Sequence, residues 1–263
     1  MGFTHVLKRR SLRLSATFLA ALGLFATIFG ALVYVLPVSL DASDSHHFSQ
    51  TRFWGHKGGG ANEFPQNSPQ AVANAFAKGL DGVELDTYFD RALDKIVVSH
   101  DLPYIKQGGE IITLDTFPIP ANGRLWLDLK NLKNLSDSDM KRVAQIFAEL
   151  DLTDRTLVES TAMLPLIRLN AHGVQTIFWM YADDTRSPIY YIAVKVLTWV
   201  FGINGVSVSI GNLEYVQPHF ASSSIFTFTE NSPKRLCELS NQSAVAVVLT
   251  DLPAQRLSSK ICE

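Results

Sequence analysis

Residues 54–101 read WGHKGGGANEFPQNSPQAVANAFAKGLDGVELDTYFDRALDKIVVSHD, and this stretch decides both the fold and the candidate site. Within it, His56 ends one short apolar run and His100 ends another. Glu84 and Asp86 lie two residues apart in a predicted strand, so both carboxylates point to the same face. Two histidines and a pair of acids at strand ends indicate acid–base chemistry assisted by a metal ion.

Strand-like runs alternate with helical or loop segments along most of the chain, which is typical of parallel α/β architecture. Only seven residues separate the second run from the third, too few for a parallel crossover, so these two runs are predicted to form an antiparallel hairpin. Eight parallel strands remain, which predicts a (β/α)₈ TIM barrel with a hairpin after its second strand. The nine runs centre on Phe53–His56, Gly82–Thr87, Lys95–Ser99, Leu125–Leu129, Thr156–Glu159, Val174–Met180, Gly205–Ile210, Ser224–Thr229 and Ala244–Thr250.

Barrel enzymes gather their active-site residues at the carboxyl ends of the strands. In the fourth run, alternation predicts that the leucines face the helices, whereas Asp128 and Lys130 face the barrel axis. An acid and a lysine are costly to bury there unless they pair or bind a charged ligand. We therefore predict Glu84, Asp86 and Asp128 as metal ligands. Carboxylates without a cluster of cysteine or histidine favour Mg²⁺ or Ca²⁺ over zinc.

The order of several short motifs resembles the glycerophosphodiester phosphodiesterase family. His-x-Gly begins at His56, Pro-x-Asn-Ser at Pro65, Glu-x-Asp at Glu84 and His-Asp at His100. Further matches follow at 128–130, 226–231 and 249–253, so the resemblance covers roughly residues 52–253. It implies a TIM-barrel enzyme that uses one divalent cation to hydrolyse glycerophosphodiesters to glycerol phosphate and an alcohol.

Cleavage of a phosphodiester needs neutralised phosphoryl oxygens, an activated hydroxyl and a proton for the departing alkoxide. Lys57 and Lys130 are predicted to bind the substrate phosphate beside the metal. His56 and His100 are predicted to transfer the protons, because imidazole titrates near neutral pH; the sequence does not decide which one is the acid. The resemblance implies that a neighbouring hydroxyl of the glycerol is the first nucleophile.

Four positions depart from the family's pattern. Lys57 stands where the family has an arginine, which replaces a bidentate phosphate contact by a point charge. Gln66 and Asp128 each stand where the family has a glutamate, and Phe228 where it usually has a tryptophan. Glu159 ends the fifth predicted strand and is left outside the predicted site.

The departures leave two other hypotheses open. The Asp-x-Lys pair at 128–130 resembles sphingomyelinase D-type phospholipases, which suggests a phospholipase D-like enzyme acting on a lysophospholipid or sphingolipid. The second alternative is a barrel that binds phosphate or a lipid headgroup without catalysing a reaction, and Lys57 and Gln66 are the residues that support it.

The N-terminal residues 1–40 are predicted to form a basic cytoplasmic stub and a transmembrane signal anchor. Their 16–36 portion is almost wholly apolar, and about 20 such residues cross a bilayer. The positive-inside rule then places the remaining chain, a linker over 41–51 and a catalytic domain over 52–263, on the extracytoplasmic side. The alternative is a cleaved signal peptide, whose apolar core is usually shorter, about 7–15 residues. Four basic residues precede the apolar stretch: Lys8, Arg9, Arg10 and Arg13.

A second membrane contact at 188–202 is one of two open interpretations, because only Lys195 and Thr198 interrupt an otherwise apolar helix. The aromatic side chains would enter the bilayer while Lys195 reaches the headgroups. The alternative is a helix covered by a neighbouring loop. The aromatic residues are Tyr190, Tyr191, Trp199 and Phe201.

Composition limits the remaining possibilities. The chain has 263 residues, 47% of them hydrophobic, which is enough to build a folded core and excludes a disordered protein. Beyond the N-terminal basic residues it carries 19 Lys and Arg against 25 Asp and Glu, which argues against nucleic-acid binding. Cys237 and Cys262 are either a disulfide or two free thiols.

Overall fold

The computed structural model describes residues 52–59, 63–102, 110–220, 225–253 and 262, together with isolated positions between 18 and 27. The chain divides into two units, Met1–Asp44 and Ser45–Glu263. The predicted anchor and linker lie almost wholly outside the described residues. Within the part that the structure describes, no helix has both the length and the apolar character needed to span a membrane.

The strands of the second unit form a closed parallel barrel. Eight of the strands run parallel, and the barrel closes because β1 pairs with both β9 and β2. The strand β3 pairs antiparallel with β2, as the seven-residue gap predicts. The TIM barrel and its hairpin are therefore confirmed. The strands are β1 (Arg52–Gly55), β2 (Gly82–Asp90), β3 (Lys95–Val98), β4 (Arg124–Leu129), β5 (Thr156–Ser160), β6 (Gln175–Trp179), β7 (Gly205–Ser209), β8 (Ile225–Phe228) and β9 (Val245–Thr250).

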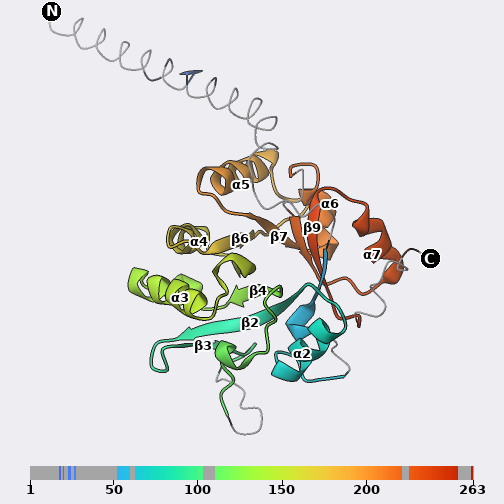
Figure 1. Cartoon of the computed structure of the whole chain (residues 1–263). Helices are drawn as coiled ribbons and strands as arrows, with labels where there is room; N and C mark the ends of the chain where they lie inside the picture. Colours follow the sequence, from blue (N-terminus) through green and yellow to red (C-terminus); the bar gives the residue numbers. More distant parts are fainter. Residues whose placement is uncertain are drawn as a thin grey trace, which may run out of the picture. The chain divides into compact units, whose positions relative to one another are not determined.

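Helices lie around the outside of the strands (Figure 1). Serine side chains cap three of them: Ser68 accepts a hydrogen bond from Ala71 at the start of α2, and Ser136 and Ser232 cap α3 and α7 in the same way. The helices are α2 (Pro69–Ala77), α3 (Asp137–Glu149), α4 (Met163–Asn170), α5 (Pro188–Val200), α6 (Leu213–Val216) and α7 (Pro233–Ser240).

Apolar side chains pack on both faces of the barrel strands. The leucines of β4 belong to the large core between strands and helices, whereas Trp126 belongs to a smaller core inside the barrel, as the alternation predicts. Trp54 fills the inner core so closely that a Cβ on Gly82 would lie 2.5 Å from the indole ring. Apolar side chains thus fill the lower part of the barrel interior, and the polar ends of the strands above them can form a site.

The helix α5 covers the barrel with one face and exposes the other. Tyr191, Val194 and Thr198 are buried. The ring of Tyr191 stacks on His219 with centroids 4.5 Å apart, and its hydroxyl donates to the Asp183 carbonyl. The prediction that Tyr191 enters a membrane is therefore wrong, because this side chain lies on the barrel-facing side. The apolar residues that remain exposed are Ile189, Leu197, Trp199, Val200 and Phe201.

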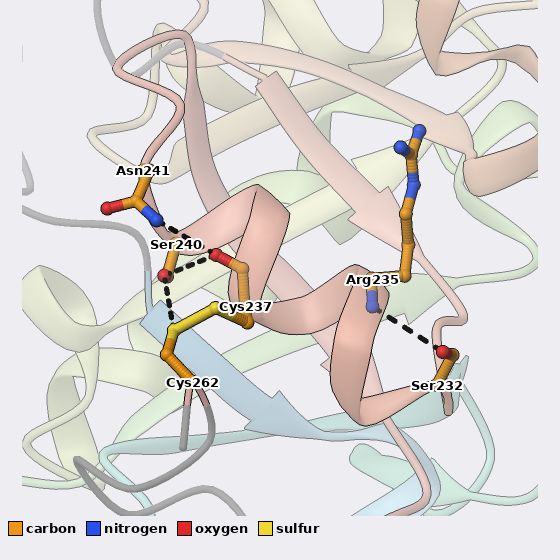
Figure 2. The surroundings of a disulfide bond; sticks show 6 residues. All are labelled: Ser232, Arg235, Cys237, Ser240, Asn241 and Cys262. Atoms are coloured by element: carbon orange, nitrogen blue, oxygen red, sulfur yellow. Dashed lines mark hydrogen bonds between the residues drawn. A yellow bond between two sulfur atoms is a disulfide. The ribbon is translucent and has the colours of Figure 1, made fainter.

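The two cysteines form a disulfide, one of the two alternatives that the sequence leaves open. Cys237 in α7 is bonded to Cys262, 25 residues further along the chain. Figure 2 shows the Cys237 carbonyl accepting hydrogen bonds from Ser240 and Asn241 at the end of the helix. The bond therefore ties Cys262 to a helix end that is itself held by hydrogen bonds.

Candidate active site

One cavity at the carboxyl ends of the strands gathers every predicted site residue. It is lined by His56, Lys57, Glu84, Asp86, His100, Asp128, Lys130, Glu159, Trp179, Phe228 and Leu249. The structure thus brings together all seven side chains selected from the sequence and adds Glu159, which the prediction omitted. Proximity alone does not assign their roles, which stay predictions.

The loop after β1 is shaped by residues in the left-handed conformation. Lys57, Gly58 and Gly59 have φ angles of 50°, 89° and 79°, which glycine adopts readily and lysine rarely. This turn directs the Lys57 amide toward the barrel, where it donates to Glu84 Oε2 at 2.8 Å. The His-x-Gly motif therefore places His56 on the rim and fixes the carboxylate of Glu84 in the Glu-x-Asp motif.

Asn67 fixes the second carboxylate. Its amide nitrogen donates to Asp86 Oδ2 at 2.8 Å, and its amide oxygen accepts from the Asp86 backbone N–H at 3.0 Å. Both residues are buried, so this pair of hydrogen bonds holds the aspartate in one orientation. Asn67 belongs to the Pro-x-Asn-Ser motif, and the sequence alone predicts no role for it.

Lys130 lies between two acids of the site. Its Nζ is 2.7 Å from Asp86 Oδ1 and 2.5 Å from Asp128 Oδ2, and Lys57 Nζ lies 3.4 Å from Asp86 Oδ2. Burial alone lowers the pKa of Lys130, but the charges and hydrogen bonds of the two aspartates raise it above its usual range. Burial likewise opposes ionisation of Asp86, yet Lys130, Asn67 and Lys57 hold its pKa below the ordinary value.

The other acids of the cavity have raised pKa values. Burial, reinforced by the charge of Asp86, raises the pKa of Glu84 well above its usual range. Burial also raises the pKa of Asp128, despite the opposing charge of Lys130. For Glu159, burial and then the charge of Asp128 raise the pKa to about 8. Burial is the main cause in all three, so a nearby positive charge would favour the ionised form of these acids.

A divalent cation fits this set of donors. Among the residues that the structure describes, no group of three acidic, histidine or cysteine side chains already converges as a metal site. However, four carboxylates and two lysines line the cavity, and Glu159 Oε1 is buried without a hydrogen-bond partner in the described part of the chain. Carboxylate oxygens suit Mg²⁺ or Ca²⁺, and two positive charges would balance the excess of acid.

The two histidines are supported differently. His56 Nδ1 lies 2.9 Å from Asp251 Oδ1, whereas His100 Nδ1 lies 2.8 Å from Asp101 Oδ1 in a much more exposed pair. The hydrogen bond with His56 lowers the pKa of Asp251, so this residue is a carboxylate and His56 Nδ1 must be the donor. That tautomer leaves His56 Nε2 as the nitrogen that can accept a proton.

Asp251 is itself held by Asn231. The Asn231 amide nitrogen donates to Asp251 Oδ2 at 2.9 Å, and the Asp251 backbone N–H donates to Asn231 Oδ1 at 2.7 Å. Both residues belong to the two C-terminal motifs, 226–231 and 249–253, and neither is among the site residues predicted from the sequence. The motif positions were a usable signal, but only the structure shows that they act on His56.

Aromatic side chains form one side of the cavity. Trp179 and Phe228 line it, with ring centroids 5.4 Å apart in an edge-to-face arrangement. Tyr181 stacks on Trp179 at 6.0 Å and is largely exposed. We call Trp179, Tyr181 and Phe228 the aromatic wall.

An adjoining cavity shares Lys57 and His100 and is lined by Gln66, which places this departure from the family's pattern beside the site.

Comparison of this fold with solved structures identifies its class. A glycerophosphodiester phosphodiesterase from Thermotoga maritima matches with a TM-score of 0.61 at 18% identity, covering 81% of this chain and 100% of that one. One from Parabacteroides distasonis matches with a TM-score of 0.60 at 18% identity, covering 81% and 98%. An Oleispira antarctica phosphodiesterase, in complex with the product sn-glycerol-3-phosphate, matches with a TM-score of 0.57 at 15% identity, covering 80% and 96%.

The resemblance predicted from the motifs is therefore confirmed at the level of the fold: the chain is a TIM barrel with the architecture of glycerophosphodiester phosphodiesterases. Sequence comparison alone adds nothing to this assignment, since no family model and no curated protein matches the chain.

Proposed function

We propose that this chain is a phosphodiesterase that hydrolyses glycerophosphodiesters to glycerol phosphate and an alcohol with the help of one divalent cation, Mg²⁺ or Ca²⁺. The observation that carries the proposal is the single cavity in which two histidines, two lysines and four carboxylates meet at the carboxyl ends of the barrel strands. The fold shared with phosphodiesterases supports the same conclusion.

The cation would be held by Glu84, Asp86 and Asp128, and when bound it supplies positive charge to the phosphoryl oxygens. Lys57 and Lys130 bind the phosphate from the same side of the cavity.

The histidines move the protons. One imidazole takes the proton of the attacking hydroxyl, and the other gives a proton to the alkoxide that leaves when its P–O bond breaks. His56 has the firmer support, because Asp251 and Asn231 fix its tautomer, while His100 is open to solvent. Because one histidine takes a proton and the other gives one, the proposal requires both side chains.

The experiment uses the full chain, purified in detergent and stripped of metal with a chelator. Glycerophosphocholine is added with Mg²⁺ or Ca²⁺, and glycerol phosphate and choline are measured. We expect glycerol phosphate to form only when a cation is present, and His56→Ala and His100→Ala each to lower kcat by at least about 100-fold. Choline phosphate as the product, or full activity in either variant, contradicts the proposal.

The aromatic wall supports a second candidate, cleavage of a choline-bearing lysophospholipid in the manner of a phospholipase D. Aromatic rings bind quaternary ammonium groups through cation–π contacts, and Trp179, which lines the cavity, stacks on the exposed ring of Tyr181. Lysophosphatidylcholine in the same assay separates the two candidates, because activity on the lipid without activity on glycerophosphocholine favours the second.

We further propose that the chain is held at a membrane with its barrel on the extracytoplasmic side. The apolar sequence of 16–36 and the preceding basic residues support an anchor. The disulfide supports an oxidising compartment. The exposed apolar face of α5, which includes Trp199 and Phe201, supports contact of the barrel with lipid. Flotation of the barrel with vesicles after removal of 1–40 tests that contact, and a Trp199→Ser variant that floats equally well contradicts it.

A further inference from the structure

Glu159 occupies a position in the barrel that is level with the predicted cation ligands. Asp86 pairs with Asp128 across β2 and β4, and Asp128 pairs with Glu159 across β4 and β5. Adjacent strands lie about 4.8 Å apart, so these three residues form a row along the barrel wall. On β5, Leu157 packs in the inner core and Val158 in the outer one, so alternation turns Glu159 inward with Leu157.

The carboxylate of Glu159 is buried and incompletely bonded. The residue is only 4% exposed, it lines the cavity, and its Oε1 has no hydrogen-bond partner within the described residues. A buried oxygen in this state costs free energy unless some group outside the protein chain satisfies it. The Ser207 hydroxyl and the Trp126 indole N–H approach the carboxylate closely enough to lower its pKa, but neither reaches hydrogen-bond geometry with it in the described part of the chain.

The charges around Glu159 favour a cation as the missing partner. Lys130 is shared between Asp86 and Asp128, and Lys57 lies nearest to Asp86, so neither lysine forms an ion pair with Glu159. The carboxylate also repels Asp128 and Glu84, the two acids whose charges interact with it. A water molecule could satisfy the oxygen, but it would not relieve this repulsion, whereas a divalent cation would do both.

We infer that Glu159 is a fourth carboxylate of the cation site, acting with Glu84, Asp86 and Asp128. Its side chain is one methylene longer than that of Asp128 on the neighbouring strand, and both side chains line the same cavity. The inference rests on the proposed function, because it concerns the cation that this function requires.

The test measures cation binding rather than turnover. The full chain, Glu159→Gln, Glu84→Gln and the surface control Glu214→Gln are stripped with chelator and titrated calorimetrically with CaCl₂ and MgCl₂. We expect Glu159→Gln to weaken binding by at least about tenfold, since loss of even an indirect partner of a metal ligand costs about 10–100-fold. Glu214 lies on α6 outside the cavity, so its variant should bind as the unaltered chain does.

Thermal unfolding separates a cation ligand from a structural acid. Without metal and at pH 9, above the raised pKa of Glu159 of about 8, Glu159→Gln should melt at or above the temperature of the unaltered chain, because it removes a buried negative charge beside Asp128. The rise in Tm on adding saturating Ca²⁺ should shrink in this variant. A structural role predicts the opposite, namely a lower Tm without metal and an unchanged rise.

The outcomes distinguish failure of this inference from failure of the proposed function. If the unaltered chain binds neither cation, the cation of the proposed function is refuted, and the inference with it. If Glu84→Gln weakens binding and Glu159→Gln does not, only the inference fails. Should Glu159→Gln not fold, Glu159→Asp retains the charge but shortens the reach, and unchanged affinity in that variant overturns the inference.

Discussion

Replacing Asp251 by asparagine should inactivate the enzyme without unfolding it, because the amide cannot satisfy both of its neighbours. The Asn231 amide nitrogen donates to Asp251 Oδ2, while the Asn231 oxygen is committed to the Thr250 hydroxyl and the Asp251 backbone N–H. Asn231 therefore cannot flip without losing two hydrogen bonds. An asparagine at 251 must then point its NH₂ group either at the Asn231 NH₂ group or at His56.

Both orientations impair His56. If the new NH₂ group faces Asn231, two donors oppose each other, at a cost of about 1–3 kcal/mol. If it faces His56, it stabilises the tautomer that carries the proton on Nε2. The prediction takes His56 as the base of the proposed reaction, and in this tautomer Nε2 cannot accept a proton from the substrate. Because a positioned general base contributes about 10²–10⁴-fold, we expect kcat to fall by at least about 100-fold, or about 2.7 kcal/mol in activation free energy.

The matched control is Asp101→Asn. Asp101 makes the equivalent hydrogen bond to His100, but its side chain is 66% exposed, against 27% for Asp251. Water can replace an exposed partner, so this variant should lose less than about tenfold in kcat. The assay is the release of glycerol phosphate at saturating glycerophosphocholine, with KM determined separately.

Since Asp251 acts on proton transfer, kcat should fall while KM changes by less than about threefold. A fall in Tm of less than about 5 °C would show that the variant remains folded. If Asp251→Asn retains more than about a third of wild-type kcat, or if Asp101→Asn loses as much, the supporting role of Asp251 is refuted.

Three further outcomes are expected. Cys237→Ser should lower the free energy of unfolding by about 3.5 kcal/mol and Tm by roughly 10 °C, since the bond to Cys262 closes a loop over a separation of 25 residues; an equal Tm with and without reductant in the unaltered chain would contradict this. The bidentate contact with Arg91 holds the pKa of Asp139 below its usual range, so the stability advantage over Asp139→Asn should be complete above the unfolded pKa of about 4. It should shrink progressively as pH falls from there toward the lower pKa of the folded state, and urea midpoints that differ equally at pH 3 and pH 7 would refute this. Trp179→Ala should raise KM for glycerophosphocholine more than for glycerophosphoethanolamine, and equal rises would exclude a cation–π contact with the headgroup.

The sequence predicts the barrel well because its strands are bounded by clear signals. Seven residues between the second and third strands are too few for a crossover, and this alone separates the hairpin from the parallel strands. The prediction ended the second strand at Thr87, whereas β2 continues to Asp90 because pairing with β3 extends it. Its end depends on a partner strand, which local composition does not reveal.

Most of the predicted site residues lie at or just after the end of a strand, so topology gathers them on one rim. Glu84 and Asp86 lie inside β2 and join them because alternation turns both carboxylates toward the cavity. Glu159 ends a strand too, but a lone acid gives no sign that its carboxylate lacks a partner. Tyr191 was misjudged for a related reason. Its helix is apolar around most of its circumference, so the pattern does not reveal which face meets the barrel.

The support of His56 depends on closure of the barrel. β1 and β9 lie at opposite ends of the domain sequence, yet their pairing sets Gly55 opposite Thr250, and the next residue on each strand is His56 or Asp251. The two side chains therefore meet across the closing seam, although 195 residues separate them along the chain. Closure is a property of the whole sheet, because the seven other parallel strands of the barrel determine the position of β9. The histidine motif near the start of the domain and the Thr-Asp motif near its end are consequently joined by one hydrogen bond. A mutation that separates β1 from β9 should therefore remove the tautomer control of His56 even where the predicted cation ligands on β2 and β4 stay in place.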